Sequence, residues 1–212
     1  MKDSKIIKLW LVKNNNPLKP ITNEELLIAS ELTKRKAYQY KYSRGYVREI
    51  LSNLFNISPL EIKLNAKPGK APVLPKKFGH ISFSHCNDAL LIGWSRYFIG
   101  VDIERKDRIF SAKNLMDNFY CEPEKNYIKS LNTKKQKKNI LKLWNLKEAA
   151  IKLQRGSIMK DLKFWQINSN LEEAFHNENK KKIKILHLYY EYWSLGIASE
   201  KEIIKPLICL YK

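Results

Sequence analysis

Two acidic residues, Asp102 and Glu104, stand two positions apart in an otherwise apolar segment, residues 99–104. If this segment is a strand, both carboxylates share one face while Val101 and Ile103 point into a core. Adjacent carboxylates repel each other unless a cation lies between them, and a hard divalent ion with oxygen ligands meets that need. Taken alone, the pair is weak evidence for a metal site, and a strand end whose acids face water is the better explanation.

A third acid, Glu148, lies in residues 140–153, which are predicted to form an amphipathic helix. Glu148 and Lys152 are four residues apart and therefore share a helix face, on which Trp144 lies one turn earlier. A surface Glu–Lys pair is the commonest origin of this spacing, but the aromatic side chain indicates a face that is not simply exposed to water. A carboxylate and an ammonium beside a metal ion suit phosphoryl or pyrophosphate chemistry.

Ser84 and His85 end a third segment, a predicted strand over residues 80–84. Both side chains can donate hydrogen bonds to a phosphate. The rival reading is a Ser/His pair for nucleophilic catalysis, but adjacent residues diverge on leaving a strand and no third partner is evident, so a hydrolase triad is not expected. Arg44 and Arg48 lie one turn apart on an earlier predicted helix, either to reach one anion together or as two solvated side chains.

The elements that must position these groups indicate an α+β fold. Thr22 and Glu25 form a capping-box pattern at a helix start. We expect two similar α/β halves, a pseudo-dimer in which each half packs a small, mostly antiparallel sheet against a long helix. The halves are residues 1–105 and 106–212, with the active site between them. The expected strands are 5–12, an antiparallel meander of 80–84, 89–95 and 98–104, and then 162–167, 183–190, 192–198 and 207–211.

The composition shows a strong positive charge without low complexity. The chain has 212 residues, with 40 Lys+Arg against 21 Asp+Glu, a formal charge of +19. Hydrophobic residues at 44% and aromatics at 11% exclude a wholly disordered basic protein. The charge favours an anionic partner, which can be nucleic acid, an acidic protein, a phosphorylated metabolite or a membrane surface. It is spread over both halves, and lysine-rich runs such as residues 134–138 are expected to be solvated loops.

The location of the protein is also suggested by its sequence. Three cysteines at irregular spacing form neither a zinc pattern nor a disulfide framework, which favours a reducing cytoplasm. The first residues lack the features of a secretion signal, and no segment approaches the roughly 20 apolar residues that cross a bilayer. We therefore expect neither secretion nor membrane insertion.

Taken together, the motifs resemble those of the 4′-phosphopantetheinyl transferases. They are most similar to the larger, two-halved monomeric class, the type that activates surfactin synthetase. The matching motifs span residues 69–152 in the order and spacing of that family. They are Gly69-Lys70-x-Pro72, Phe83-Ser84-His85, Gly100-Val101-Asp102-Ile103-Glu104 and Trp144-x-x-Lys147-Glu148-x-x-x-Lys152.

The resemblance implies transfer of the phosphopantetheine arm of coenzyme A to a serine of an apo acyl or peptidyl carrier protein, with release of adenosine 3′,5′-bisphosphate. By the same resemblance, Asp102, Glu104 and Glu148 would bind the Mg²⁺ or Mn²⁺ that grips the pyrophosphate. Lys152 would neutralise the pyrophosphate and the leaving group. The carrier supplies the nucleophile, which agrees with the missing triad. Glu148, or a metal-bound water that it orients, is the candidate base.

The remaining carried-over roles concern the coenzyme. Lys70, Ser84, His85 and Arg44 would hold coenzyme A, chiefly near its 3′-phosphate, whereas Arg48 fits a salt bridge equally well. The resemblance also implies an acidic position at Glu124 whose role, including that of base, stays open. It further implies a monomer without stably bound nucleic acid.

The chain departs from the family pattern at three places. Cys86 follows His85 where the family has Ser, Ala71 interrupts the Lys-Pro pair, and Gly156 alone remains of a glycine-rich stretch. These departures concern the shape of the coenzyme pocket and the choice of carrier. Two alternatives stay open from the residues alone: a metal-dependent nuclease that uses the same acids, and a basic nucleic-acid-binding protein whose acids are salt-bridge partners.

Overall fold

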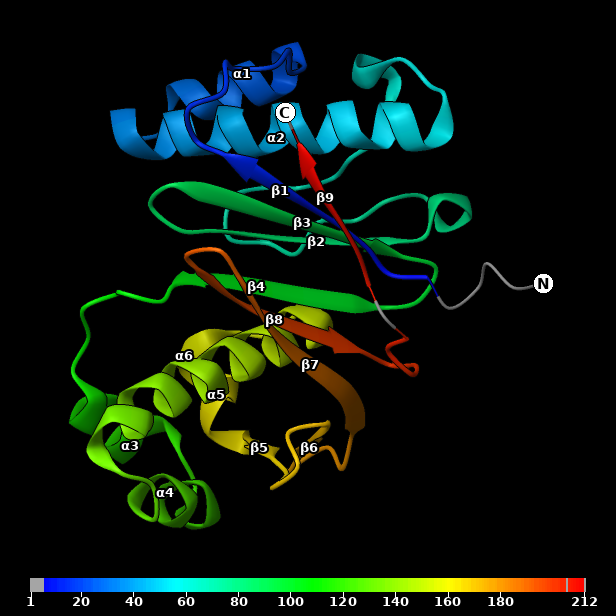
Figure 1. The fold of residues 1–212 in the computed structure, drawn as a ribbon. Coiled ribbons are helices and arrows are strands. Elements are labelled where there is room, and N and C mark those ends of the chain that lie inside the picture. Colours follow the sequence, from blue (N-terminus) through cyan, green and yellow to red (C-terminus); the bar gives the residue numbers. More distant parts are fainter. Residues whose placement is uncertain (1–5, 205, 212) are drawn as a thin grey trace.

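The computed structural model describes residues 6–204 and 206–211. Two sheets lie face to face between two long helices, so the layers are α2, the first sheet, the second sheet and α5 (Figure 1). The first sheet has the order β2-β3-β1-β9 and the second β4-β8-β7-β6-β5. The strands are β1 (Lys8–Lys13), β2 (His80–His85), β3 (Ala89–Ser95), β4 (Ile99–Arg105), β5 (Trp165–Ile167), β6 (Glu173–His176), β7 (Lys182–Tyr190), β8 (Trp193–Ser199) and β9 (Leu207–Tyr211).

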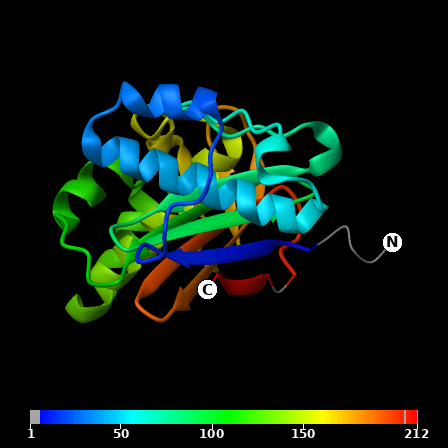
Figure 2. The ribbon, with the colours of Figure 1, turned by 90° about the horizontal axis from the view of Figure 1, so that it is seen from above.

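The helices carry most of the remaining regular structure. Seen from above, α2 lies across the first sheet with α1 beside it (Figure 2). The helices are α1 (Asn23–Ser30), α2 (Lys34–Phe55), α3 (Ala112–Phe119), α4 (Glu122–Lys129), α5 (Thr133–Gln154) and α6 (Ile158–Asp161), with 3-10 turns η2 (Pro59–Glu61), η3 (Lys76–Phe78) and η4 (Leu162–Phe164). In the residues described, no helix has both the length and the apolar character needed to cross a bilayer.

The predicted α+β class is confirmed, because each sheet is mostly antiparallel and covered by one long helix. The exception to antiparallel pairing is β9, which lies parallel to β1. Each sheet takes a strand from across residue 105: β9 returns to the first sheet, and β4 joins the second. The division into domains 1–105 and 106–212 stays a prediction.

The expected meander of β2, β3 and β4 is wrong at its last strand. β2 pairs with β3, but β4 pairs with β8, with Asp102 opposite Gly196. β4 instead packs face to face on β3, since a Cβ on Gly93 would lie 2.5 Å from a methyl carbon of Val101. The missing side chain lets the two sheets approach. The strand that carries Asp102 and Glu104 is therefore the edge of the second sheet, stacked on the first.

Three apolar layers hold these elements together. Tyr46, Leu51 and neighbouring side chains of α2 pack on the outer face of the first sheet. Side chains such as Leu9 and Val101 fill the space between the sheets, and α5 packs on the second sheet through residues such as Leu146. Each amphipathic helix thus buries one face, as expected for layered domains.

Helix boundaries differ from the expected ones mainly at α5. The helix begins at Thr133, so the lysine-rich run 134–138 is helical rather than a loop. Asn132 caps it by accepting the backbone N–H of Lys135 at 3.1 Å. The apolar stripe starts only at Ile140, which is why the pattern predicts a later start. The predicted capping box at Thr22 is confirmed, and the expected first-strand residue Lys5 lies outside the described residues.

Candidate metal centre and anion-binding cleft

The three predicted carboxylates meet at the contact between β4 and α5. Asp102, Glu104 and Glu148 each offer an oxygen, and these oxygens lie within 4.8 Å of one another. Asp102 is buried, whereas Glu104 and Glu148 are partly exposed. Val101 and Ile103 point the other way into the layer between the sheets, as the strand alternation predicts.

A glycine on β4 permits this meeting. A Cβ on Gly100 would lie 1.9 Å from the carbonyl oxygen of Ala149 and 2.5 Å from the backbone nitrogen of Leu153. Any side chain here would push α5 away from the strand. The close approach therefore brings the last turns of α5, with Glu148 and Lys152, beside Asp102.

The carboxylate of Asp102 is held from several sides. Its Oδ1 accepts hydrogen bonds from Ser84 Oγ at 2.8 Å and from Lys152 Nζ at 2.6 Å. Its Oδ2 accepts one from Asn145 Nδ2 at 2.8 Å. Burial alone would raise the pKa of Asp102, but the Lys152 ammonium and the hydrogen bonds from Ser84 and Asn145 outweigh it and hold the pKa below its ordinary value. Asp102 is thus ionised at neutral pH.

The pKa of Glu148 is shifted in the opposite direction. Burial, and then the neighbouring Asp102 carboxylate, raise the pKa of Glu148 to about 8, although Lys152 at 3.8 Å partly offsets this. Ionisation of two neighbouring carboxylates is favoured when a cation lies between them. The raised pKa and the all-oxygen donor set both fit a hard divalent ion such as Mg²⁺ or Mn²⁺. The cluster is therefore suited to holding one.

Glu104 has a cationic partner that the sequence pattern does not indicate. Its carboxylate pairs with Arg108 Nη1, and the Arg108 guanidinium also lies 5.8 Å from the ring centre of Trp144. Residues 106–110 form a loop after β4, so no periodicity marks Arg108 in advance. A metal bound by Glu104 would compete with this ion pair.

A cleft of about 690 Å³ opens beside the carboxylate cluster. The predicted coenzyme residues Arg44, Lys70, His85 and Lys152 all line it. Three further cationic side chains, not predicted, also line it: Lys36, Lys67 and Arg155. Within residues 6–204 and 206–211, no acidic side chain does. Such a cavity is complementary to a polyanionic ligand.

His85 and Ser84 take different places in this arrangement. The His85 ring lines the cleft, and desolvation by its surroundings, followed by the Lys152 ammonium, lowers the pKa of His85. His85 is therefore neutral at pH 7. Ser84 is buried and does not line the cleft; its hydroxyl donates to Asp102 and accepts from Lys152 at 2.6 Å. The structure thus places Ser84 beside the carboxylate cluster, and its coenzyme-binding role stays a prediction.

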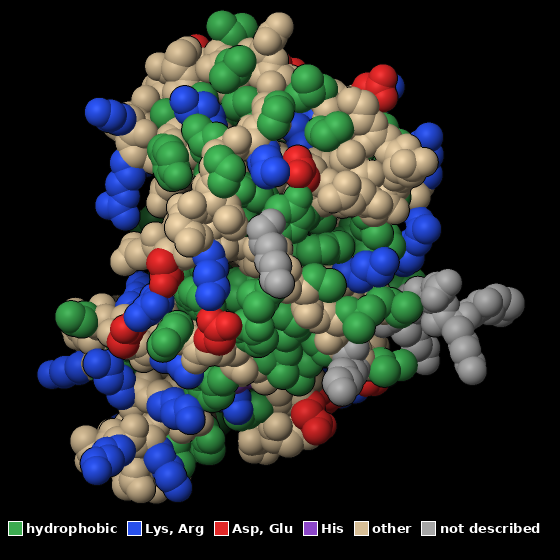
Figure 3. Space-filling view, turned by 45° about the horizontal axis from the view of Figure 1, so that its top comes forward, with side chains coloured by type: hydrophobic (Ala, Val, Ile, Leu, Met, Phe, Trp, Pro, Cys, Tyr) green, Lys and Arg blue, Asp and Glu red, His purple; other side chains and the backbone are tan. Residues whose placement is uncertain are grey.

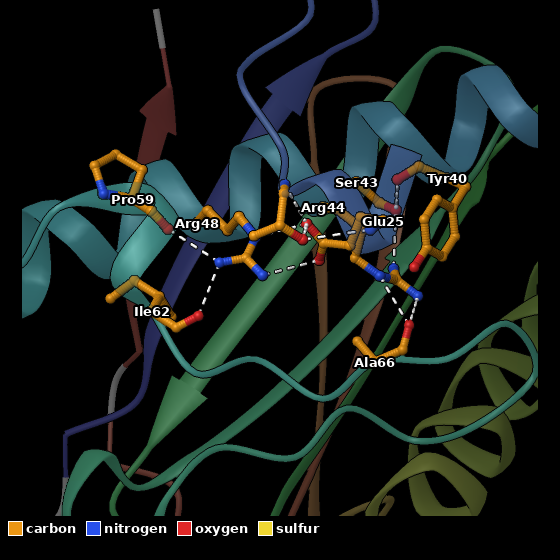
Figure 4. Close-up of polar contacts among 9 residues, drawn as sticks. Glu25, Tyr40, Ser43, Arg44, Arg48, Pro59, Ile62 and Ala66 are labelled. Atoms are coloured by element: carbon orange, nitrogen blue, oxygen red, sulfur yellow. Dashed lines mark hydrogen bonds and ion pairs between the residues drawn. The ribbon is translucent and has the colours of Figure 1, made fainter. Parts of the chain in front are cut away.

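Arg44 and Arg48 do not reach one common anion, as Figure 4 shows. Arg44 is buried against the cleft wall, where Nε donates to Ala66 O at 2.9 Å and the guanidinium lies 4.3 Å from the ring centre of Tyr40. Arg48 Nε donates to Glu25 Oε2 at 2.8 Å, and both side chains are almost fully buried. Of the two readings left open for Arg48, the salt bridge is the one found.

Glu124 lies in a buried ion pair, apart from the carboxylate cluster. Its Oε2 is 2.7 Å from Lys147 Nζ and accepts the backbone N–H of Cys121, while Oε1 accepts the N–H of Ile167 at 2.9 Å. Lys147 also donates to the carbonyl oxygen of Phe119. These bonds join α4, α5 and β5, which is a structural role.

The positive charge is dispersed on the one face that Figure 3 shows. On the face in Figure 3, lysine and arginine side chains are scattered among polar and apolar ones and form no continuous basic path. This agrees with the even spread of charge along the sequence. The acid-free cleft beside the carboxylates is the more specific site for an anion.

Two comparisons with known proteins found similar sequences. A model of the 4′-phosphopantetheinyl transferase superfamily matches residues 98–204, which include all three carboxylates and Lys152. The chain is also similar to the 4′-phosphopantetheinyl transferase gsp of Aneurinibacillus migulanus, with 24% identity over 149 residues. The matched region is 70% of this chain and 62% of that relative, so the chain spans less than two thirds of the relative's length.

Proposed function

This chain belongs to the 4′-phosphopantetheinyl transferase superfamily, and we propose that it transfers the 4′-phosphopantetheine group of coenzyme A to a serine of an apo carrier protein. The observation that carries the proposal is the carboxylate cluster at the edge of an acid-free cationic cleft. Coenzyme A carries a pyrophosphate and a 3′-phosphate. A cleft of about 690 Å³ has room for such a ligand.

Asp102, Glu104 and Glu148 would hold the divalent ion, Mg²⁺ or Mn²⁺. When bound, the ion would supply charge neutralisation at the pyrophosphate and polarise the phosphorus under attack. The chain's own part is to keep the three carboxylates together against their repulsion, which Lys152, Ser84 and the close α5–β4 contact accomplish.

The transfer forms a bond between the serine oxygen and the phosphorus that bears pantetheine, and it breaks the pyrophosphate P–O bond. Adenosine 3′,5′-bisphosphate leaves with the bridging oxygen and its negative charge. Lys152 is placed to neutralise that charge, because its ammonium lies at the junction of the metal cluster and the cleft. An ammonium there stabilises the transition state more than the bound substrate.

Glu148 is our candidate for accepting the serine proton, either directly or through a water. Its carboxylate lies beside Asp102, and its pKa of about 8 in the metal-free protein would fall when a divalent cation binds. Glu124 is the less suitable base, since its oxygens are committed to Lys147 and to two backbone N–H groups.

Lys70, His85 and Arg44 would hold coenzyme A near its 3′-phosphate. The lining residues Lys36, Lys67 and Arg155 add charge to the same cleft. We assign Ser84 to positioning Asp102 and Lys152 instead, on account of its two hydrogen bonds to them. We also propose that the chain acts as a monomer in the cytoplasm; among the residues described, its three cysteines are free.

Incubation with coenzyme A, Mg²⁺ and apo carrier proteins tests the proposal. We expect intact-mass measurement to show the added arm on at least one carrier of the fatty-acid, polyketide or nonribosomal-peptide type. A parallel incubation with DNA tests the nuclease alternative. Unmodified carriers together with metal-dependent DNA cleavage would overturn the proposal.

A further inference from the structure

A series of hydrogen bonds, buried except at its His187 end, leads away from the carboxylate cluster, and no part of the mechanism above uses it. Asp102 Oδ2 accepts from Asn145 Nδ2 at 2.8 Å, and Asn145 Oδ1 accepts from Ser194 Oγ at 2.7 Å. Ser194 Oγ in turn lies 2.8 Å from His187 Nε2. The chain thus crosses from β4 through α5 to β8 and β7.

The donors and acceptors of these residues allow only one direction for the series of hydrogen bonds. An ionised Asp102 only accepts, so the amide NH₂ of Asn145 must face it and the amide oxygen must face Ser194. The Ser194 hydroxyl then donates to that oxygen, which leaves Ser194 Oγ as the acceptor for His187. His187 therefore carries its proton on Nε2, and every donor in the chain points toward Asp102.

His187 is suited to the end of such a chain. Burial, and then the nearby Lys142 and Lys138, lower the pKa of His187 to about 3. Its ring is therefore neutral at physiological pH, with one N–H to donate. The edge of the same ring packs against Tyr189, with ring centres 4.5 Å apart, which restricts its rotation.

The packing around the amide is tight. Asn145 and Ser194 are both fully buried. A Cβ on Gly196 would lie 2.4 Å from the carbonyl oxygen of Asn145 and 3.0 Å from its Cβ. In the second sheet Gly196 stands opposite both Asp102 and His187. The absence of a side chain at Gly196 therefore lets α5 pack closely on β8 where the Asn145 amide contacts Asp102.

These contacts also distribute the lone pairs of Asp102. Ser84 and Lys152 occupy the two on Oδ1, and Asn145 occupies one on Oδ2. Rotation of the carboxylate would break bonds on both oxygens. The orientation of Asp102 is thus set partly by Ser84 and Asn145, neither of which lines the cleft.

We propose that Asn145, supported by Ser194 and His187, is a positioning residue that fixes the Asp102 carboxylate for a divalent cation. The inference rests on the proposed function only in taking Asp102 as a metal ligand. Hydrogen bonds to a metal ligand orient it, and their loss typically lowers metal affinity or activity by about 10- to 100-fold. A purely structural amide would leave the metal affinity unchanged.

Titration of the metal-free protein with Mn²⁺, followed by electron paramagnetic resonance without coenzyme A, measures this directly. For Asn145→Leu, which removes the amide at similar volume, we expect a dissociation constant about 10-fold or more above wild type. For Ser194→Ala we expect a smaller increase of the same sign, about three-fold, since the amide keeps its bond to Asp102. Ser199→Ala is the matched control: a buried serine on the same strand whose Oγ accepts the backbone N–H of Lys201. It should bind Mn²⁺ as wild type does.

Transfer kinetics give the second readout. We expect Asn145→Leu to lower kcat while the KM for coenzyme A stays close to wild type, because the cleft residues are untouched. If Asn145→Leu fails to fold in a thermal-unfolding assay, Ser194→Ala carries the test alone. Wild-type Mn²⁺ affinity in Ser194→Ala together with any folded Asn145→Leu would overturn the inference, as would a wild-type chain that binds no Mn²⁺.

The two proposals fail differently. A wild-type chain that modifies no carrier and cleaves DNA in a metal-dependent way would overturn the proposed function. The same chain would still support the positioning role if Mn²⁺ affinity fell in the order wild type, Ser194→Ala, Asn145→Leu. Normal transfer by wild type with unchanged Mn²⁺ affinity in both variants would support the function and overturn the positioning role.

Discussion

Lys152 Nζ lies 2.6 Å from Asp102 Oδ1 across the contact between α5 and β4, and the same ammonium is 2.6 Å from Ser84 Oγ. The Lys152 side chain thus connects α5 with β4, the strand of Asp102 and Glu104, and with β2, the strand that ends at His85. About a quarter of the Lys152 side chain remains exposed, on the side that lines the cleft. This geometry gives Lys152 both a structural and a chemical task.

Replacement of Lys152 by Met should separate the two tasks. Without the ammonium, the leaving group loses its neutralising charge, so we expect kcat to fall about 100-fold or more. The dissociation constant for coenzyme A should rise far less, because other cations line the cleft. Steady-state kinetics and calorimetric binding measure both effects. Lys134→Met, an exposed lysine near the start of the same helix, is the control; an unchanged kcat in Lys152→Met would refute the leaving-group role.

The raised pKa of Glu148 should appear in the pH dependence of stability. The folded-state pKa is about 8, above the ordinary value of 4.5, so the unfolded chain releases this proton first as pH rises. The contribution of Glu148 to stability is therefore full below pH 4.5 and is lost as pH rises toward 8. We expect the Tm of the metal-free wild type, relative to Glu148→Gln, to fall between pH 5 and pH 8.

Thermal unfolding at several pH values, with and without Mg²⁺, checks this prediction. Mg²⁺ should raise the Tm of wild type more at pH 8 than at pH 6, because the cation competes with the proton for the carboxylates. It should have less effect on Glu148→Gln, which has lost one carboxylate. Parallel Tm curves of wild type and Glu148→Gln in the absence of metal would contradict the assignment.

The two arginines of α2 should respond differently to substitution. Arg48→Met leaves the Glu25 carboxylate buried without its partner, so we expect a loss of about 3–5 kcal/mol in unfolding free energy. Arg44→Met should instead raise the KM for coenzyme A, since Arg44 lines the cleft. Chemical denaturation and steady-state kinetics separate the effects. An Arg48→Met protein of wild-type stability would show that the ion pair contributes little.

The sequence predicts the local elements better than their long-range partners. The alternation in residues 99–104 predicts β4 and the shared face of Asp102 and Glu104, because these depend on neighbouring residues alone. The partner of β4 is β8, over ninety residues later in the chain, and no local pattern specifies that pairing. Gly93 and Gly100 mark places where another segment packs closely on the strand, but a glycine in the sequence does not indicate which segment that is.

In the candidate site, too, local patterns are predicted from the sequence better than long-range contacts are. Spacing on one strand and one helix predicts the carboxylates and Lys152, and the family resemblance supplies their common purpose. Asn145 was missed, although an asparagine inside a helix is a weak helix former and therefore calls for a reason. That reason is a contact with Asp102, forty-three residues away. Glu25 likewise was predicted as a cap, and its second bond, to Arg48, depends on how α1 packs on α2.

Gly100→Ala should damage the site through packing alone. The new methyl group would meet the backbone of α5 at Ala149 and Leu153, neither of which can move without shifting the helix. Overpacking of this kind typically costs about 1–3 kcal/mol of stability, and we expect a value at the upper end. The larger consequence is for metal binding, because α5 must move away from β4 and carry Glu148 away from Asp102.

Mn²⁺ affinity should therefore fall even in the fraction of the Gly100→Ala protein that folds. Gly93→Ala is the graded comparison: its Cβ would meet the side chains of Val101 and Ile99 between the sheets and leave the contact of α5 with β4 unobstructed, so it should lower stability and reduce Mn²⁺ affinity less than Gly100→Ala does. Equal Mn²⁺ affinities for Gly100→Ala and wild type would show that the carboxylate cluster does not depend on the close approach of helix and strand.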